Sequence, residues 1–288
     1  MNCMATGLVL EGGGMRGIYT SGILDEMLQE GIKVDGLIGV SAGIIHGISY
    51  VSEQYARNIR YFVKYRSDKR FMSIQSLIKT GNVCEDEFCY NDIPKRLAPL
   101  DFEKFRKRTA EGFRVFSVAT NLETGKAEYI PITDVETQMD AVKASASLPL
   151  VSKVVEYKGM KLLDGGSADS IPLKAMQERG FSKNIVILTR PDGFVKKPDH
   201  SMPIMKKVYK NYPEYLDTCE RRYIDYNSEL AYVQKESEKG NAFVIRPSRS
   251  FKVARSETDI EKIKRMYKLG RYDAKNNMRG IKKFLSET

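Results

Sequence analysis

A serine between two glycines is the clearest sign of chemistry in this sequence. The pentapeptide Gly39-Val40-Ser41-Ala42-Gly43 follows an apolar run, Gly36 to Val40, and precedes a helical pattern, Ile44 to Val51. A G-x-S-x-G turn between a strand and a helix strains the serine backbone and exposes its hydroxyl, while the glycines let chain segments pass closely. The pattern predicts that Ser41 is a nucleophile, although the same residues also fit an ordinary strand-to-helix turn.

A glycine-rich loop, Gly12-Gly13-Gly14-Met15-Arg16-Gly17, follows the first apolar run. Its glycines satisfy the dinucleotide-binding pattern G-x-G-x-x-G, but that use requires an acid at the end of the second strand. The nearest acid, Asp35, precedes that strand instead. Such a loop also presents backbone N–H groups at a helix N-terminus, where they stabilise an anion. If Ser41 attacks an ester, the loop would form the oxyanion hole.

The sequence has only two histidines that could serve Ser41 as a base. His46 lies five residues after Ser41 on the same predicted helix, about 140° around its axis, so we expect it to pack away from the serine. His200 would complete the chain order Ser, Asp, His of α/β-hydrolases. Those enzymes reach the nucleophile after several strands, whereas Ser41 follows the second. We therefore interpret His200 as a surface residue.

The remaining candidate base is a carboxylate. The stretch Lys161-Leu162-Leu163-Asp164-Gly165-Gly166 ends a short apolar run with an acid and two glycines. A carboxylate placed there would meet a reacting group with little steric obstruction. An aspartate beside glycines is also a common turn residue, so this stretch alone leaves the role of Asp164 open.

Short apolar runs and helical patterns alternate over the first 200 residues, which predicts an α/β domain with a largely parallel sheet. After Pro203 the period becomes helical, apart from a strand-like run, Ala242 to Ile245. We expect two long amphipathic helices there, covering the α/β core. The predicted division is an α/β domain of residues 1–200 and a basic helical extension of residues 201–288 packed on it. The other expected strands cover residues 8–11, 36–40, 113–119, 127–131, 161–163 and 184–189.

The composition, with 42% hydrophobic and 29% charged residues, is that of a globular protein and excludes disorder, collagen and coiled-coil fibres. The cysteines at positions 3, 84, 89 and 219 lack zinc-site spacing and are too few for a disulfide framework. No leader is visible, and no run reaches the roughly 18 apolar residues of a spanning helix. We expect a cytoplasmic protein.

The net charge of +10 is concentrated near the end of the chain, because residues 241–288 hold 13 basic and 5 acidic side chains. Such asymmetry favours phosphate-bearing partners, either nucleic acid or a membrane surface. The basic face of the last helix fits an anionic membrane or simply water. The same two interpretations apply to a segment that interleaves cations with aromatics: Arg57, Arg60, Tyr61, Phe62, Lys64, Tyr65, Arg66, Lys69, Arg70 and Phe71.

Taken together, these motifs resemble the bacterial type of the patatin-like phospholipase family. The resemblance rests on G-G-G-x-R-G, then G-x-S-x-G, then D-G-G, in family order. Two further stretches agree: Ala144 to Pro149 resembles the A-S-x-x-x-P block, and Ala119 to Gly125 resembles A-T-D-x-x-T-G, with Asn121 in place of the acid. The resemblance covers roughly residues 7 to 190.

The resemblance implies a patatin-like three-layer α/β/α fold and a Ser–Asp dyad without histidine. Ser41 would be the nucleophile, Asp164 its base, and Gly12 to Gly17 the oxyanion hole. The implied activity is hydrolysis of fatty acyl esters of phospholipids or lysophospholipids, with no metal or organic cofactor. Arg16 would orient the loop or meet substrate phosphate, or it would pair with a structural carboxylate.

The expected partner is a lipid or acyl-ester substrate, with peripheral contact at the inner face of an anionic membrane as a further expectation and no nucleic acid. Two other functions stay open. One is a catalytically silent protein that binds membrane or nucleic acid, against which intact Ser41 and Asp164 count. The other is a dinucleotide-binding protein that uses the glycine-rich loop.

Overall fold

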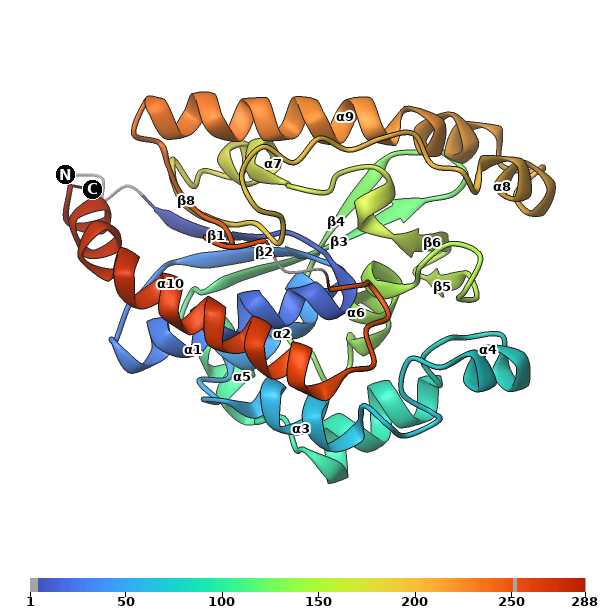
Figure 1. Ribbon diagram of the computed structural model, residues 1–288, viewed down its shortest axis with the longest axis horizontal. Coiled ribbons are helices and arrows are strands. Elements are labelled where there is room, and N and C mark those ends of the chain that lie inside the picture. Colours follow the sequence, from blue (N-terminus) through green and yellow to red (C-terminus); the bar gives the residue numbers. More distant parts are fainter. Residues whose placement is uncertain (1–4, 251–252, 288) are drawn as a thin grey trace.

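A twisted sheet between two layers of helices forms the centre of the molecule (Figure 1). The computed structural model describes residues 5–250 and 253–287. Within them the sheet has eight strands in the order β5-β6-β3-β2-β1-β7-β8, with β4 also paired to β3. The strands are β1 Thr6–Leu10, β2 Gly36–Val40, β3 Arg114–Asn121, β4 Ala127–Pro131, β5 Val155–Tyr157, β6 Met160–Asp164, β7 Lys183–Ile187 and β8 Ala242–Ile245.

The three-layer fold expected from the sequence is confirmed, and the sheet is mixed. Strands β3, β2, β1, β7 and β8 run parallel, whereas β4, β5 and β6 are antiparallel to their neighbours. The three-residue strand β5, which the sequence analysis did not predict, forms a hairpin with β6 around Lys158 and Gly159. Such a short strand carries too little alternation to be seen in a sequence.

Side chains alternate between the two faces of the sheet, so each face has its own core. Leu8 and Leu10 of β1 join one apolar cluster with α1 and α10, while Val9 between them joins a second cluster with α7 and α9. The helices are α1 Ile18–Gln29, α2 Ala42–Val51, α3 Arg57–Tyr65, α4 Ile74–Thr80, α5 Phe102–Ala110, α6 Met139–Ala146, α7 Leu173–Glu178, α8 Met202–Val208, α9 Pro213–Glu238 and α10 Ile260–Ser286, with 3-10 turns at Gly14–Gly17 and Gly165–Ser167 and a π-helix at Phe88–Leu97.

The last 90 residues contribute to all three layers. Strand β8 extends the sheet beside β7, α9 covers one face, and α10 lies along α1 on the other (Figure 1). Helices α1 and α10 touch through glycines, because a Cβ on Gly270 would lie 2.1 Å from the carbonyl oxygen of Tyr19. The predicted helices that cover the core are present. The predicted boundary at residue 200 stays a prediction.

Candidate active site

The turn after β2 has the geometry that its glycines predict. Ser41 adopts φ 54° and ψ −122°, a left-handed conformation that is costly for a residue with a side chain. A Cβ on Gly39 would lie 2.6 Å from the amide nitrogen of Ile44, and one on Gly43 would lie 2.4 Å from the carbonyl oxygen of Leu10. Both contacts leave room for glycine alone, so the chain holds Ser41 at a sharp elbow above the end of β2.

Strand register brings Asp164 to this elbow. The last residue of β2, Val40, pairs with Val118 of β3. Antiparallel strand β6 joins the same strand one residue further on, where Asp164 pairs with Ala119. The carboxyl ends of β2 and β6 therefore meet on β3, and both Ser41 and Asp164 line one small cavity of about 40 Å³.

The carboxylate of Asp164 is buried, with its Oδ1 accepting a hydrogen bond from the Gly166 amide at 2.8 Å. Among the described residues, its Oδ2 has no partner with standard hydrogen-bond geometry. Burial raises the pKa of Asp164 above that of a free aspartate, while the Ser41 hydroxyl and the cation of Arg222 oppose the shift. A raised pKa makes this carboxylate a stronger base than a free one.

Hydrogen bonds from two other segments hold the pair in place. The Ser41 amide donates to the Ser145 hydroxyl at 2.8 Å, and the Asp164 amide donates to the Ser147 carbonyl at 2.8 Å. The Thr120 hydroxyl donates to the Asp164 carbonyl at 2.9 Å. These contacts give a physical role to the segments around residues 144–149 and 119–125. Sequence reasoning identified the segments but missed Ser145 as a positioning residue.

Half of the glycine-rich loop remains open to a ligand. The Met15 amide donates to the Arg255 carbonyl at 2.9 Å, and the Arg16 amide donates to the Gly13 carbonyl at 3.3 Å. In the described part of the chain, the amides of Gly12, Gly13 and Gly14 have no hydrogen-bond partner, and all three residues line the cavity with Ser41. The first half of the predicted loop thus has amides available to a ligand beside Ser41, and its role as an oxyanion hole stays a prediction.

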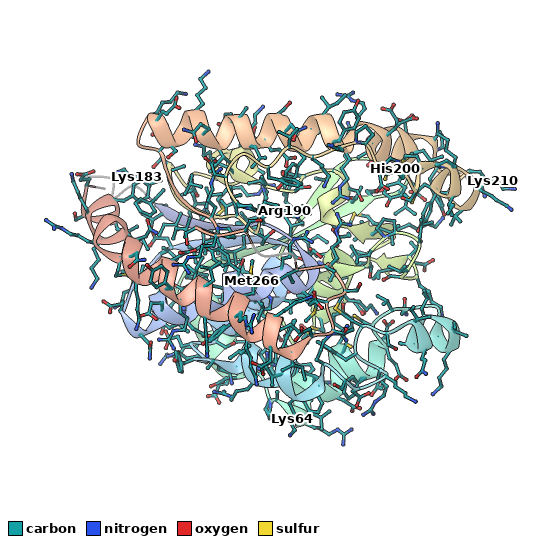
Figure 2. All side chains as sticks on the ribbon, viewed as in Figure 1. Lys64, Lys183, Arg190, His200, Lys210 and Met266 are labelled. Atoms are coloured by element: carbon teal, nitrogen blue, oxygen red, sulfur yellow. The ribbon has the colours of Figure 1, made fainter. Side chains whose placement is uncertain are left out.

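Neither histidine reaches this cavity. His46 is fully buried against Phe62, with ring centroids 5.2 Å apart, and burial lowers its pKa to about 3. It is a neutral core residue, as its position on the helix predicts. His200 is exposed on the loop before α8 and does not line the cavity (Figure 2), as expected of a surface residue.

Two other sequence interpretations are settled by burial and contacts. Asp35 accepts hydrogen bonds from the amide and hydroxyl of Thr6 at the opposite end of β1, far from where a ribose would lie beside the glycine-rich loop. In the aromatic segment, Arg57, Tyr61, Phe62, Arg66 and Phe71 are buried. Their burial favours the interpretation of a partly buried stripe over that of a lipid-facing surface.

Basic side chains gather around the cavity. Besides Arg16 they are Arg190 and Lys196 in the loop between β7 and α8, Arg222 on α9, and Arg255 before α10. Arg190 is labelled in Figure 2, and it is partly buried. The sequence analysis named only Arg16, because the other four come from distant segments with no common motif.

A family model described as patatin-like phospholipase matches residues 8–176. The chain belongs to this family. A second model, described as a domain of unknown function (DUF6363), matches residues 212–286, a range that includes Arg222 and Arg255. Membership supports lipid hydrolysis in general terms and confirms the resemblance drawn from the motifs.

Two curated proteins and one solved structure are similar to this chain. The uncharacterized protein YjjU of Escherichia coli (strain K12) is 25% identical over 296 residues, which cover 97% of this chain and 79% of YjjU. Lysophospholipase NTE1 of Candida albicans is 28% identical over 189 residues, which cover 64% of this chain but only 13% of NTE1. The solved structure of VipD from Legionella pneumophila has a TM-score of 0.45 at 13% identity, covering 99% of this chain and 67% of VipD.

Within the described ranges, no helix is both long and apolar enough to cross a bilayer.

Proposed function

We propose that this protein is a serine acyl hydrolase that cleaves fatty acyl esters of phospholipids or lysophospholipids through Ser41 and Asp164. The observation that carries the proposal is the register of β2 and β6 on β3, which brings the strained serine and the buried carboxylate to one cavity. Patatin-like family membership supports the lipid substrate.

The chemistry follows from the positions of these groups. The Ser41 hydroxyl attacks the acyl carbon while Asp164 takes its proton, and the amides of Gly12 to Gly14 bind the resulting oxyanion. When the intermediate collapses, the carbon–oxygen bond to the alcohol breaks and Asp164 returns the proton to the leaving alcohol. Water then attacks the acyl-enzyme, with Asp164 as base, and releases the fatty acid and free Ser41.

An apolar groove of about 400 Å³ adjoins the cavity and shares Leu148, Arg222 and Arg255 with it. Its walls come from α4, α8 and residues 148–151, and these helices lie at the same end of the molecule (Figure 1). Exposed apolar side chains continue outward on both helices, at Ile74, Ile78, Ile204 and Val208. A groove of this size and lining suits an acyl chain.

Hydrolysis of a p-nitrophenyl acyl ester tests the proposal. Wild-type protein should turn the ester over, and Ser41→Ala should lower kcat/KM by more than about a thousandfold, because a covalent nucleophile is lost. Ser228→Ala, at an exposed position on α9, is the matched control and should keep full activity. Residual activity in Ser41→Ala above about a tenth of wild type would exclude Ser41 as the nucleophile.

A further inference from the structure

The cations around the Ser41 cavity form no salt bridge with any described residue. Arg16 is buried, Arg190, Lys196 and Arg222 are partly buried, and Arg255 is exposed. Of the salt bridges among residues 5–250 and 253–287, none includes any of these five side chains. Converging cations without partners repel one another and favour an anion between them.

Two carboxylates, Glu11 and Asp164, line the cavity together with the five cations and offset only part of their charge. Glu11 accepts hydrogen bonds from the Tyr226 hydroxyl at 2.7 Å and from the amide and hydroxyl of Thr189, and Asp164 is the proposed base. Burial and the neighbouring cations together lower the pKa of Arg16 to about 10 and that of Lys196 to about 7. Even with Lys196 partly neutral at pH 7, four arginines face the carboxylates of Glu11 and Asp164, so the cavity carries an excess of positive charge.

Two details distinguish the type of anion. The buried Nε of Arg16 has no hydrogen-bond partner in the described structure. The aromatic faces are occupied, because Arg190 lies 4.3 Å from the centroid of Phe194 and Lys196 lies 4.6 Å from that of Tyr226. A quaternary ammonium needs free aromatic faces or available carboxylates. In the described cavity both rings already carry a cation, and the Glu11 carboxylate already accepts three hydrogen bonds.

We propose that this cavity binds a dianionic phosphate, the head group of an acyl ester that ends in an unsubstituted phosphate, in preference to a choline-bearing one. The proposal rests on the proposed acyl hydrolase function and names its substrate class. The ester would lie at Ser41, the acyl chain in the groove beyond Leu148, and the phosphate among the cations. Four of these cations lie between residues 190 and 255, outside the patatin-like match, so the C-terminal part of the chain would set head-group specificity.

Substrate pairs that differ only in head group provide the kinetic test. Wild-type protein should favour 1-oleoyl lysophosphatidic acid over 1-oleoyl lysophosphatidylcholine by at least about tenfold in kcat/KM, since Arg–phosphate hydrogen bonds are charge-assisted. Arg190→Gln and Arg255→Gln, alone and combined, should lower this ratio, by about tenfold in the double variant. Equal use of the two lipids by wild type, or an unchanged ratio in the double variant, would overturn the proposal.

The choice of variants keeps the rest of the site intact. Arg222 is avoided because its Nε donates to the Gly166 carbonyl beside Asp164. Arg255 holds Met15 through its backbone carbonyl, which glutamine retains. Arg279→Gln, an exposed cation on α10, makes the same charge change away from the cavity and should leave the ratio at the wild-type value.

Inorganic phosphate provides a test that needs no lipid turnover. It should raise the melting temperature of wild type, and the Arg190→Gln/Arg255→Gln variant should lose most of that shift. Phosphate stabilisation with no preference for lysophosphatidic acid would mean that the cations bind a free phosphate, and the head-group assignment would be wrong. Stabilisation without turnover of any ester would refute the acyl hydrolase function while leaving the anion site in place.

Discussion

Charge is handled in opposite ways in two regions of the molecule that both involve the C-terminal residues. In the seam between α1 and α10, charged and polar groups are paired. The Glu26 carboxylate of α1 forms ion pairs with the Arg271 guanidinium at 2.7 Å and with the Lys275 ammonium at 3.7 Å. The Tyr267 hydroxyl donates to Asp25 at 2.9 Å. In the Ser41 cavity, the five basic side chains form no ion pair within the described residues.

The difference separates structural cations from available ones. A paired charge at a buried seam is satisfied by the fold and stabilises it when its partner is present. A cluster of unpaired cations costs free energy in the folded state, and proteins keep such clusters where a ligand binds. The basic side chains of this protein thus fall into at least two groups, those that form ion pairs and those that do not.

The largest expected effect is on the cavity side of this comparison. Asp164→Asn should lower kcat/KM for an acyl ester by more than about a thousandfold, because an amide cannot take the Ser41 proton. His200→Ala and His46→Ala should each retain most activity. If His200→Ala were folded but inactive, the Ser–Asp dyad would be wrong and a triad that includes His200 would take its place. In wild type, kcat/KM should fall at acid pH with an apparent pKa above the ordinary aspartate value of about 3.9, since the pKa of Asp164 is raised.

The same substitution should not weaken the fold. A carboxyl whose pKa is raised on folding stabilises the folded state below its unfolded pKa of about 3.9, and this contribution is lost as pH rises through the higher folded value. At pH 7 the ionised Asp164 therefore reduces stability. Chemical denaturation at pH 7 should give Asp164→Asn a free energy of unfolding equal to or above that of wild type.

The seam should show the reverse behaviour. Glu26→Gln leaves Arg271 and Lys275 without their shared partner, so we expect a loss of about 1 to 3 kcal/mol of unfolding free energy. Turnover per folded molecule should stay at the wild-type level. Asn276→Ala, at an exposed position on α10 beside Lys275, is the control. Loss of activity without loss of stability in Glu26→Gln would contradict the division into two regions.

A smaller effect is expected from the residue that holds the Ser41 amide. Ser145→Ala removes the acceptor of that hydrogen bond, so kcat should fall by about tenfold while KM changes little. Ser147→Ala is the matched control, because Ser147 holds Asp164 through its backbone carbonyl. A rise in KM at unchanged kcat would assign Ser145 to substrate binding instead of positioning.

The smallest effect concerns cations that belong to neither region. Arg265, Lys268 and Arg279 are exposed on α10 and form no salt bridge in the part of the chain that the structure describes. Replacing all three by glutamine should change neither stability nor ester turnover, and pelleting with anionic vesicles should match wild type at low salt. Weaker pelleting of the variant would show that this helix contributes to membrane binding, at about 1 kcal/mol per charge.

The sequence predicted what is local and periodic. Strands β2 and β4 have the predicted bounds, and the elbow at Ser41 follows from a glycine on either side of it. The meeting of Ser41 with Asp164 was accessible only through the family resemblance. The two residues lie 123 positions apart in the sequence, and the register on β3 that joins them leaves no local pattern.

Long-range contacts explain what the sequence did not provide. Gly270 interrupts an apolar helical stripe because the Tyr19 carbonyl of another helix leaves no room for a side chain there. The cations of the Ser41 cavity come from four segments that no sequence motif connects. In the sequence, Lys196 and Arg190 cannot be told from surface cations, because their neighbours in space are not known. Pairing, rather than residue type, decides the role of such charges.

Covalent labelling with a fluorophosphonate probe tests the central claim most directly, because such a probe reacts only with a serine activated by its surroundings. Intact-mass analysis of wild type should show a single adduct, and peptide mapping should place it on Ser41. Ser41→Ala should take up no probe, and Asp164→Asn should react far more slowly than wild type. An adduct on another serine, or equal labelling of wild type and Asp164→Asn, would contradict the assignment of Ser41 and Asp164 as a catalytic pair.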